Sequence, residues 1–334
     1  SLRVPELLTG SLSGTDGQGV AVAVIDTGIT PHPDLGQQVL QGYDFVSDRP
    51  ELSAARGPEG DKVAFDGDYV DPETFGSLGW DANPADPGDW RGVAPVRPSS
   101  WHGTHVAGII GAQTNNGIGI AGVASGARIL PIRALSWNGG LSSDVAAAVI
   151  WAAGGHIAGV EDNQNPARVI NLSLGGPTES TSLTSAVQYA VDKGVLVVAA
   201  SGNSAQTACN TTPAGTPGTI SVGAINANDS ETPWSNFGDC VDIFAPGDSI
   251  ISAWPKYYSA TNTYFVESGT SMAAPHVSGA AARYLQTATV SSTTPANTWS
   301  WLKLNATCNA VAHASQTVLP RTPNRLLSVE APAS

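Results

Sequence analysis

Short, uninterrupted runs of apolar residues recur along the chain. They lack the alternation of apolar and polar residues that marks a strand with one face in water. Strands that are buried on both faces of a parallel sheet have this pattern instead. The sequence therefore predicts buried strands at Val20–Ile25, Ala127–Ile132, Val169–Leu174, Val195–Ala200 and Ile220–Ala224.

Segments typical of helices fall between these runs and after the last of them. We expect Ser142 and Ser182 to cap two of the helices and Gly194 to end one of them. Strands that alternate with helices indicate an α/β fold, here a doubly wound and mostly parallel sheet with helices on both faces. Ligands of such sheets bind at the carboxyl ends of the strands. The predicted helices are His102–Ala112, Ser142–Ala153, Ser182–Lys193, Ser271–Gln286 and a weaker one at Trp299–Leu304.

Residues 46–100 depart from this pattern, because they are acidic, contain many Gly and Pro, and have no periodicity. We interpret them as a long insertion into a single domain that spans residues 1–334. Crowded carboxylates suit a hard cation such as calcium, although a solvated acidic loop has the same composition. The candidate metal ligands in the insertion are Asp66, Asp68, Asp81, Asp86 and Asp89.

The overall charge limits the classes of partner. The chain carries 15 Lys and Arg against 28 Asp and Glu, a formal net charge of −13, which disfavours binding to nucleic acid and to anionic lipid. No apolar run reaches about 18 residues, so we predict no membrane span. No signal peptide is visible at Ser1, so a secreted protein would be present here in processed form. We expect a monomer.

A candidate nucleophile is Ser271, in the segment Gly269-Thr-Ser-Met-Ala-Ala-Pro-His276. A serine hydroxyl attacks well only when a neighbouring base activates it. Gly269 allows a close approach, and a helix that starts at this point favours developing negative charge. An ordinary serine at a helix start is the alternative. No Gly-x-Ser-x-Gly elbow of an α/β-hydrolase occurs, and we interpret Gly247-Asp-Ser249 as a surface turn.

Two further segments supply the groups that such a serine needs. His102, in His102-Gly-Thr-His-Val-Ala-Gly108, would lie on the first turn of a helix, and Asp26 ends a buried strand and precedes Thr27 and Gly28. A carboxylate there can orient an imidazole and stabilise its cation. His102 and His105 have the spacing of a metal-binding pair but lack an acidic third ligand. Asp-Thr-Gly is also the motif of aspartic proteases, but no second copy supplies the partner carboxylate.

The three segments, in the order Asp, His, Ser, resemble the subtilisin-like serine proteases, in which this chain order occurs. The resemblance extends from about residue 19 to residue 327 and is interrupted by the insertion. It implies that Asp26 orients the base, that His102 is the general base and acid, and that Ser271 is the nucleophile. It also implies that Asn203 donates to the oxyanion, together with the backbone N–H of Ser271.

The same resemblance assigns substrate contacts. Ser173, Leu174, Gly175 and Gly176 would form a strand edge that pairs with the substrate backbone, and Asn138 with Gly139 would form the opposite edge.

A disulfide is also implied. Three cysteines allow at most one intramolecular disulfide. Within the family the chain is most similar to proteinase K-like and related secreted bacterial members, and this similarity implies that Cys209 pairs with Cys240 and that Cys308 is free.

Structural calcium is another expectation that comes from the resemblance. The loop Thr114-Asn-Asn-Gly-Ile-Gly-Ile120 resembles the family's calcium loop, and Asp34 matches its distant carboxylate ligand. An N-terminal ligand found in relatives is expected to be missing, because the segment before Asp26 is short. The implied ligands are Asp34, Thr114, Asn116, Ile118 and Ile120.

The resemblance thus implies a secreted, extracellular endopeptidase that cleaves protein substrates with broad specificity through an acyl-enzyme. The competing hypothesis is a silent relative that only binds peptides, but the triad and Asn203 are all retained. The sequence leaves the P1 and P4 preferences open, because they depend on loop geometry.

Overall fold

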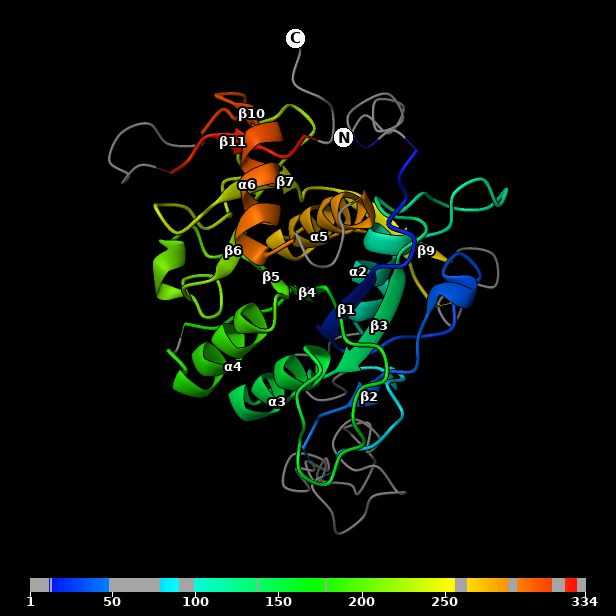
Figure 1. Cartoon of the computed structure of the whole chain (residues 1–334). Helices are drawn as coiled ribbons and strands as arrows, with labels where there is room; N and C mark the ends of the chain where they lie inside the picture. The colour runs from blue at the N-terminus through cyan, green and yellow to red at the C-terminus, as the bar shows by residue number, and fades with distance from the viewer. Residues whose placement is uncertain are drawn as a thin grey trace, which may run out of the picture.

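The computed structural model describes residues 12, 14–47, 79–89, 99–136, 138–177, 179–255, 263–287, 293–313 and 322–328. Within these residues a nine-stranded sheet runs through the molecule in the order β10-β11-β7-β6-β5-β4-β1-β3-β2 (Figure 1). All neighbouring strands are parallel except the pair β10–β11. The strands are β1 Ala21–Asp26, β2 Tyr43–Asp44, β3 Arg128–Arg133, β4 Val169–Leu172, β5 Leu196–Ala200, β6 Thr219–Ile225, β7 Ile243–Pro246, β10 Thr307–Cys308 and β11 Arg325–Leu326.

The five predicted strands are all present, with ends that shift by one or two residues, and they lie side by side as β6-β5-β4-β1-β3. Each packs on both faces of the sheet. In β1, Val22 and Val24 belong to one hydrophobic core, whereas Ala23 and Ile25 belong to the other. This double burial explains the continuous apolar runs, because neither face of these strands meets water.

Helices cover both faces of the sheet (Figure 1). The helices α2 and α5 contribute to one core, and α3 and α4 contribute to the other. The weak fifth helix is also present, as α6, and packs against α5. The doubly wound α/β fold is therefore confirmed. The helices are α2 His102–Gly111, α3 Ser142–Ala152, α4 Thr181–Asp192, α5 Thr270–Thr287 and α6 Pro295–Asn305.

The two predicted N-caps were wrong. The N-cap position of α3 is Leu141, with no side-chain cap, and that of α4 is Ser180, whose Oγ accepts from the Leu183 N–H. Ser142 and Ser182 instead lie inside the first turns, one or two residues too late to reach the unpaired backbone N–H groups. Gly194 does follow the end of α4, with a φ of +84° that favours glycine.

Several strands had no signal in the sequence. The strands β2, β10 and β11 have only two residues each, which is too short for a periodic pattern. The strands β8 (Ile250–Ala253) and β9 (Tyr264–Glu267) form a separate antiparallel pair, and Ile251, Phe265 and Val266 on it are exposed.

The described parts of the insertion are anchored to the main sheet and its helices. At its start, the Ser47 backbone N–H and hydroxyl both donate to Asp144 of α3. Further along, Asp81 exchanges two backbone hydrogen bonds with Asp44 of β2. Asp66 and Asp68 lie outside the described residues.

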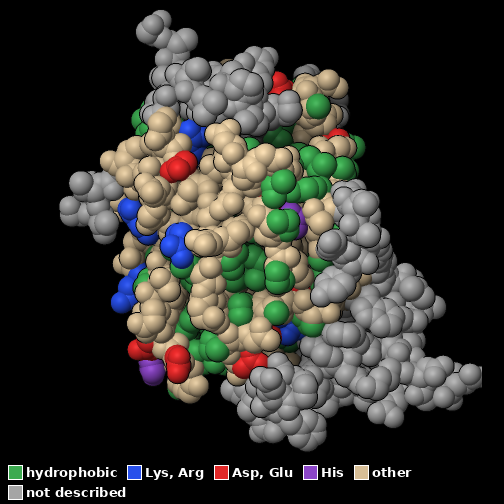
Figure 2. Space-filling view, turned by 90° about the vertical axis from the view of Figure 1, so that its right-hand side faces the viewer, with side chains coloured by type: hydrophobic (Ala, Val, Ile, Leu, Met, Phe, Trp, Pro, Cys, Tyr) green, Lys and Arg blue, Asp and Glu red, His purple; other side chains and the backbone are tan. Residues whose placement is uncertain are grey.

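Charged side chains are sparse on the face of the molecule shown in Figure 2, where hydrophobic side chains gather near the middle. Within the described residues, no helix is both long enough and apolar enough to cross a membrane.

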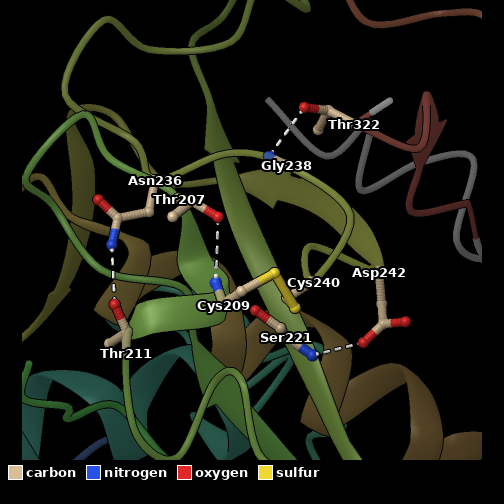
Figure 3. The surroundings of a disulfide bond; sticks show 9 residues. All are labelled: Thr207, Cys209, Thr211, Ser221, Asn236, Gly238, Cys240, Asp242 and Thr322. Carbon is tan, nitrogen blue, oxygen red and sulfur yellow. Dashed lines mark hydrogen bonds between the residues drawn. A yellow bond between two sulfur atoms is a disulfide. The ribbon is translucent and has the colours of Figure 1, made fainter. Parts of the chain in front are cut away.

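The predicted disulfide is present. Cys209 and Cys240 are bonded, and Cys308 is free and exposed. The disulfide joins the loop that follows β5 to the turn before β7 (Figure 3). Beside it, Asn236 Nδ2 donates to the Thr211 hydroxyl over 3.2 Å, which adds a second link between the same two segments.

Candidate active site

Asp26 and His102 meet at the carboxyl edge of the sheet. Asp26 is the last residue of β1 and is fully buried, and His102 is the first residue of α2. The His102 Nδ1 lies 2.8 Å from Asp26 Oδ1 and 3.0 Å from Oδ2. The Thr27 backbone N–H donates to Asp26 Oδ1 over 2.8 Å, so the carboxylate itself is held in place.

This ion pair controls the protonation of His102. Burial of the ring lowers the pKa of His102, but the charge and hydrogen bond of Asp26 outweigh it, with help from Glu267 and Asp89, and raise the pKa to about 9. The folded-state pKa thus lies above the ordinary value of 6.5. The charged pair therefore stabilises the fold fully below that pH, and the contribution is lost as the pH rises through about 9.

The other two histidines near this edge have structural environments. His105 Nε2 lies 3.1 Å from the Ile250 carbonyl oxygen and 3.2 Å from that of Phe265. Burial and the neighbouring His102 lower the pKa of His105 to about 4. His276 is buried, with Nδ1 2.8 Å from the Met272 carbonyl oxygen. In each ring, one nitrogen is thus engaged by backbone carbonyl oxygens.

Ser271 lies on the first turn of α5 and is hydrogen-bonded to Ser173, the residue that follows β4. Its hydroxyl donates to the Ser173 carbonyl oxygen over 3.1 Å, and the Ser173 hydroxyl donates to the Ser271 carbonyl oxygen over 2.7 Å. Pro275 explains the second bond. Proline has no N–H for the carbonyl four residues before it, so the Ser271 oxygen is free to accept from another group.

The Ser173 hydroxyl is itself oriented by buried groups. Asn171 Nδ2 donates to it over 2.9 Å, and the Ser278 hydroxyl donates to Asn171 Oδ1 over 2.8 Å. The chain of bonds runs from α5 through β4 and back to Ser271, so the backbone of the predicted nucleophile is fixed relative to the sheet.

Asn203 lies beside Ser271 with its amide nitrogen on the side of the serine. Its Oδ1 accepts from both the backbone N–H and the hydroxyl of Thr270, each over 2.8 Å. Because an N–H must meet the carbonyl end of an amide, these bonds fix which end is which. A methyl group on Gly269 would lie 3.4 Å from Asn203 Nδ2 and 3.6 Å from the Ser271 backbone nitrogen. The two donors therefore border one small space that Gly269 keeps open.

A buried asparagine holds the loop that carries Asn203. Asn236 Oδ1 accepts from the backbone N–H groups of Ser204 and Gln206, and Nδ2 donates to the Ser201 carbonyl oxygen. All of these contacts fall within six residues of chain around Asn203. Neither Asn236 nor Thr270 was identified from the sequence. Thr270 adjoins the nucleophile in the Gly269–His276 segment, but Asn236 lies in an irregular stretch without a signal.

Ser271 and Asn203 line a cleft of about 630 Å³. All six predicted substrate contacts line it too: Ser173, Leu174, Gly175, Gly176, Asn138 and Gly139. One of them is already paired. Gly176 donates to Thr212 over 3.0 Å and accepts from it over 2.9 Å, through the backbone. The edge that stays open therefore runs from Ser173 to Gly175.

The predicted calcium loop folds around Asp34, which is fully buried. Asp34 Oδ1 accepts from Asn116 Nδ2, and Oδ2 accepts from the Ile120 backbone N–H and the Tyr264 hydroxyl. A Cβ on Gly119 would clash with Asp34 Oδ2, so this glycine lets the loop approach the carboxylate.

The described acidic residues of the insertion each accept hydrogen bonds from neighbouring groups of the protein. Asp81 accepts from the Asn83 N–H, Asp86 from Thr27 and Gly88, and Asp89 from Ser100. Across the part of the chain that the structure describes, no group of three or more His, Cys, Asp or Glu side chains is arranged to hold a metal. A site in the insertion that includes Asp66 and Asp68 stays a prediction.

Within the described residues, Ser249 forms no hydrogen bond with a basic side chain. It is exposed in the connection between β7 and β8, and its backbone N–H donates to the Ser268 hydroxyl. The interpretation of Gly247-Asp-Ser249 as a turn fits this position.

Proteins that are named as proteases have sequences and structures similar to this chain. The "extracellular protease" of Xanthomonas campestris pv. campestris is 42% identical over 302 residues, which cover 87% of this chain and 48% of that protein. The "extracellular basic protease" of Dichelobacter nodosus is 43% identical over 291 residues, 82% of this chain and 44% of that protein. The chain thus spans about half the length of these relatives.

A solved protease structure from Pseudoalteromonas arctica superposes with a TM-score of 0.83 at 34% identity, covering 99% of this chain and 92% of its own. These likenesses do not single out a proteinase K-like subgroup, which stays a prediction. A model of the subtilase family matches residues 17–321, a range that includes Asp26, His102, Asn203 and Ser271. The chain therefore belongs to the subtilase family of serine proteases.

Proposed function

We propose that this chain is a serine endopeptidase that hydrolyses peptide bonds through Asp26, His102 and Ser271. One observation carries the proposal: the carboxylate–imidazole pair, the serine with its open strand edge, and a fixed amide donor lie at the carboxyl ends of the adjacent strands β1, β4 and β5. Relatives named as extracellular proteases support an extracellular location. A monomer of broad specificity, acting on protein substrates, belongs to the same proposal.

Asp26 orients the base. Its carboxylate accepts from Nδ1–H of His102, so in the neutral imidazole, the form that predominates above its pKa of about 9, Nε2 has no proton and can accept one. Asp26 also stabilises the imidazolium that forms when His102 takes the proton of Ser271.

Substrate binding releases the nucleophile. In the structure the Ser271 hydroxyl donates to the Ser173 carbonyl oxygen. A substrate that lies along Ser173–Gly175 as an added strand donates a backbone N–H to this carbonyl. The hydroxyl then rotates to His102, transfers its proton to Nε2, and its oxygen attacks the substrate carbonyl carbon.

The resulting oxyanion lies between Asn203 Nδ2 and the backbone N–H of Ser271. Collapse of this intermediate breaks the C–N bond, and His102 returns its proton to the leaving amine. Water then attacks the acyl-enzyme, His102 acts as base again, and Ser271 is regenerated with release of the acid product.

The nucleophile is tested by substitution. Ser271→Ala should reduce turnover of a peptide substrate by about 10⁶-fold, the loss measured for the triad serine of subtilisin, because the variant lacks the proposed nucleophile. The variant should also lose labelling by a fluorophosphonate, as measured by mass spectrometry.

Ser249→Ala is the matched control, since Ser249 is exposed in a turn outside the cleft, and it should retain both turnover and labelling. Label on Ser249 in the parent would show that the nucleophile is misassigned. An unlabelled and inactive parent would favour a relative that only binds peptides.

The oxyanion donor is tested at Asn203. Asn203→Asp keeps the oxygen that accepts from Thr270 but replaces the donating amide by a carboxylate. We expect kcat to fall by at least about 10²–10³-fold, with KM little changed, because the donor acts mainly in the transition state. Steady-state kinetics give both constants. The exposed Asn228→Asp serves as the control, and a kcat for Asn203→Asp equal to the control's would remove Asn203 from the oxyanion site.

Structural calcium at the Asp34 loop forms a second part of the proposal. The loop offers a carboxylate, the Asn116 side-chain oxygen and backbone carbonyls of Thr114, Ile118 and Ile120, which is the donor set that calcium prefers. Asp34 is buried, and no Lys or Arg within the described ranges forms an ion pair with it. A bound cation would balance this charge and stabilise the loop.

Removal of calcium should therefore destabilise the folded protein. At a calcium concentration one hundred times Kd, binding adds about 2.7 kcal/mol to the free energy of unfolding. A chelator should lower the Tm of the Ser271→Ala variant, which cannot digest itself, and calcium but not magnesium should restore it. Asp34→Asn should abolish this response, whereas the exposed Asp192→Asn should keep it. A Tm that a chelator leaves unchanged in the parent would refute the site.

A further inference from the structure

Residues 79–89 of the acidic insertion pack against the residues that follow Asp26. The Ile29 backbone N–H donates to the Pro84 carbonyl oxygen over 3.0 Å, and the Asp86 N–H donates back to Ile29 over 2.9 Å. Gly28, the residue before Ile29, has a φ of +101°, and a Cβ there would lie 2.7 Å from the Pro84 carbonyl oxygen. The insertion therefore reaches the end of β1 at close range.

This contact buries a carboxylate near the active site. Asp86 is 6% exposed, and its two oxygens accept from the Thr27 hydroxyl over 2.7 Å and from the Gly88 N–H over 2.8 Å. Burial raises the pKa of Asp86 to about 7, and the bonds from Thr27 and Gly88 oppose this change. Burial of a carboxylate costs free energy unless hydrogen bonds compensate it, and here they do so only in part.

Thr27 connects Asp86 to both sides of the Asp26–His102 pair. Its backbone N–H donates to Asp26 Oδ1, and its hydroxyl accepts from the Gly103 N–H over 3.0 Å. A hydroxyl has one proton to donate. Because Asp86 accepts that proton, a lone pair of the Thr27 oxygen faces Gly103, the residue next to His102.

The same segment also fixes the approach to α2. Asp89 accepts from the backbone N–H and the hydroxyl of Ser100. A Cβ on Gly88 would lie 2.7 Å from the Ser99 hydroxyl, so the two segments touch here. Residues 84–89 thus contact the chain just after Asp26 and just before His102.

We propose that Asp86 is a positioning residue: by orienting the Thr27 hydroxyl, it ties the end of β1 to the first turn of α2 and sets the geometry of Asp26 and His102. The inference rests on the proposed peptidase function. It gives the end of the insertion a role in catalysis without contact with substrate.

Asp86→Asn tests this directly, since it keeps the shape and an acceptor for Gly88 but offers an N–H to Thr27. At a pH above the pKa of Asp86, kcat should fall by about 10- to 100-fold with KM unchanged, as expected for a small misplacement of reacting groups. Thr27→Val should show a similar loss, and the double variant should lose little more, because both break one link.

Spectroscopy separates positioning from stability. The proton NMR resonance of His102 Nδ1–H should shift in Asp86→Asn, measured with Ser271→Ala to prevent self-digestion. Asp242→Asn is the matched control. Asp242 is also a partly buried carboxylate, and it accepts from the backbone N–H of Ser221 in β6. It does not line the cleft. The Asp242→Asn variant should lower Tm without shifting that resonance or kcat.

An Asp86→Asn variant with parental kcat and an unmoved Nδ1–H resonance would overturn the inference. If this variant does not fold, the comparison of Thr27→Val with Thr27→Ser tests the inference. Thr27→Ser keeps the hydroxyl and should retain most of the activity. Equal kcat values in the two variants would overturn the inference. Failure of the peptidase proposal is distinguishable, since the parent itself would then neither turn over peptide nor react with a fluorophosphonate.

Discussion

The close contact between the end of β1 and the first turn of α2 is the constraint on which the active site depends. A Cβ on Gly103 would clash with the Gly28 carbonyl oxygen and lie 3.2 Å from the Asp26 Cβ. Only without that side chain can the helix start where His102 reaches Asp26. Because β1 lies between β3 and β4 in the sheet, and α2 belongs to the core on one face, the pair is held by the most buried part of the fold.

The proposed nucleophile, Ser271, is held by an independent set of contacts on the other side of β4. Pro275 frees the Ser271 carbonyl oxygen, Ser173 donates to it, and Thr270 fixes Asn203. These groups act through backbone hydrogen bonds and a buried network, so their cost of reorganisation during the reaction is small. In the proposed mechanism, substrate binding then has one task at Ser271, to replace the serine hydroxyl on the Ser173 carbonyl.

The sequence predicted the central strands, four of the five helices closely, and the residues of the proposed chemistry, because each depends on a local pattern. It does not reveal contacts between distant segments. Gly176 was expected to pair with substrate, but its backbone pairs with Thr212. Asp86 was interpreted as a metal ligand because acidic residues crowd the insertion in sequence. In space it contacts Thr27, 59 residues away, which no local pattern reveals.

The pKa of His102 tests the central claim, that Asp26 sets the protonation of the base. It can be measured by NMR titration of the imidazole in the Ser271→Ala variant, alone and combined with Asp26→Asn. The account predicts a pKa above 6.5, near 9, and a clear decrease when Asp26 loses its charge. A pKa at or below 6.5, or one that Asp26→Asn leaves unchanged, would contradict it.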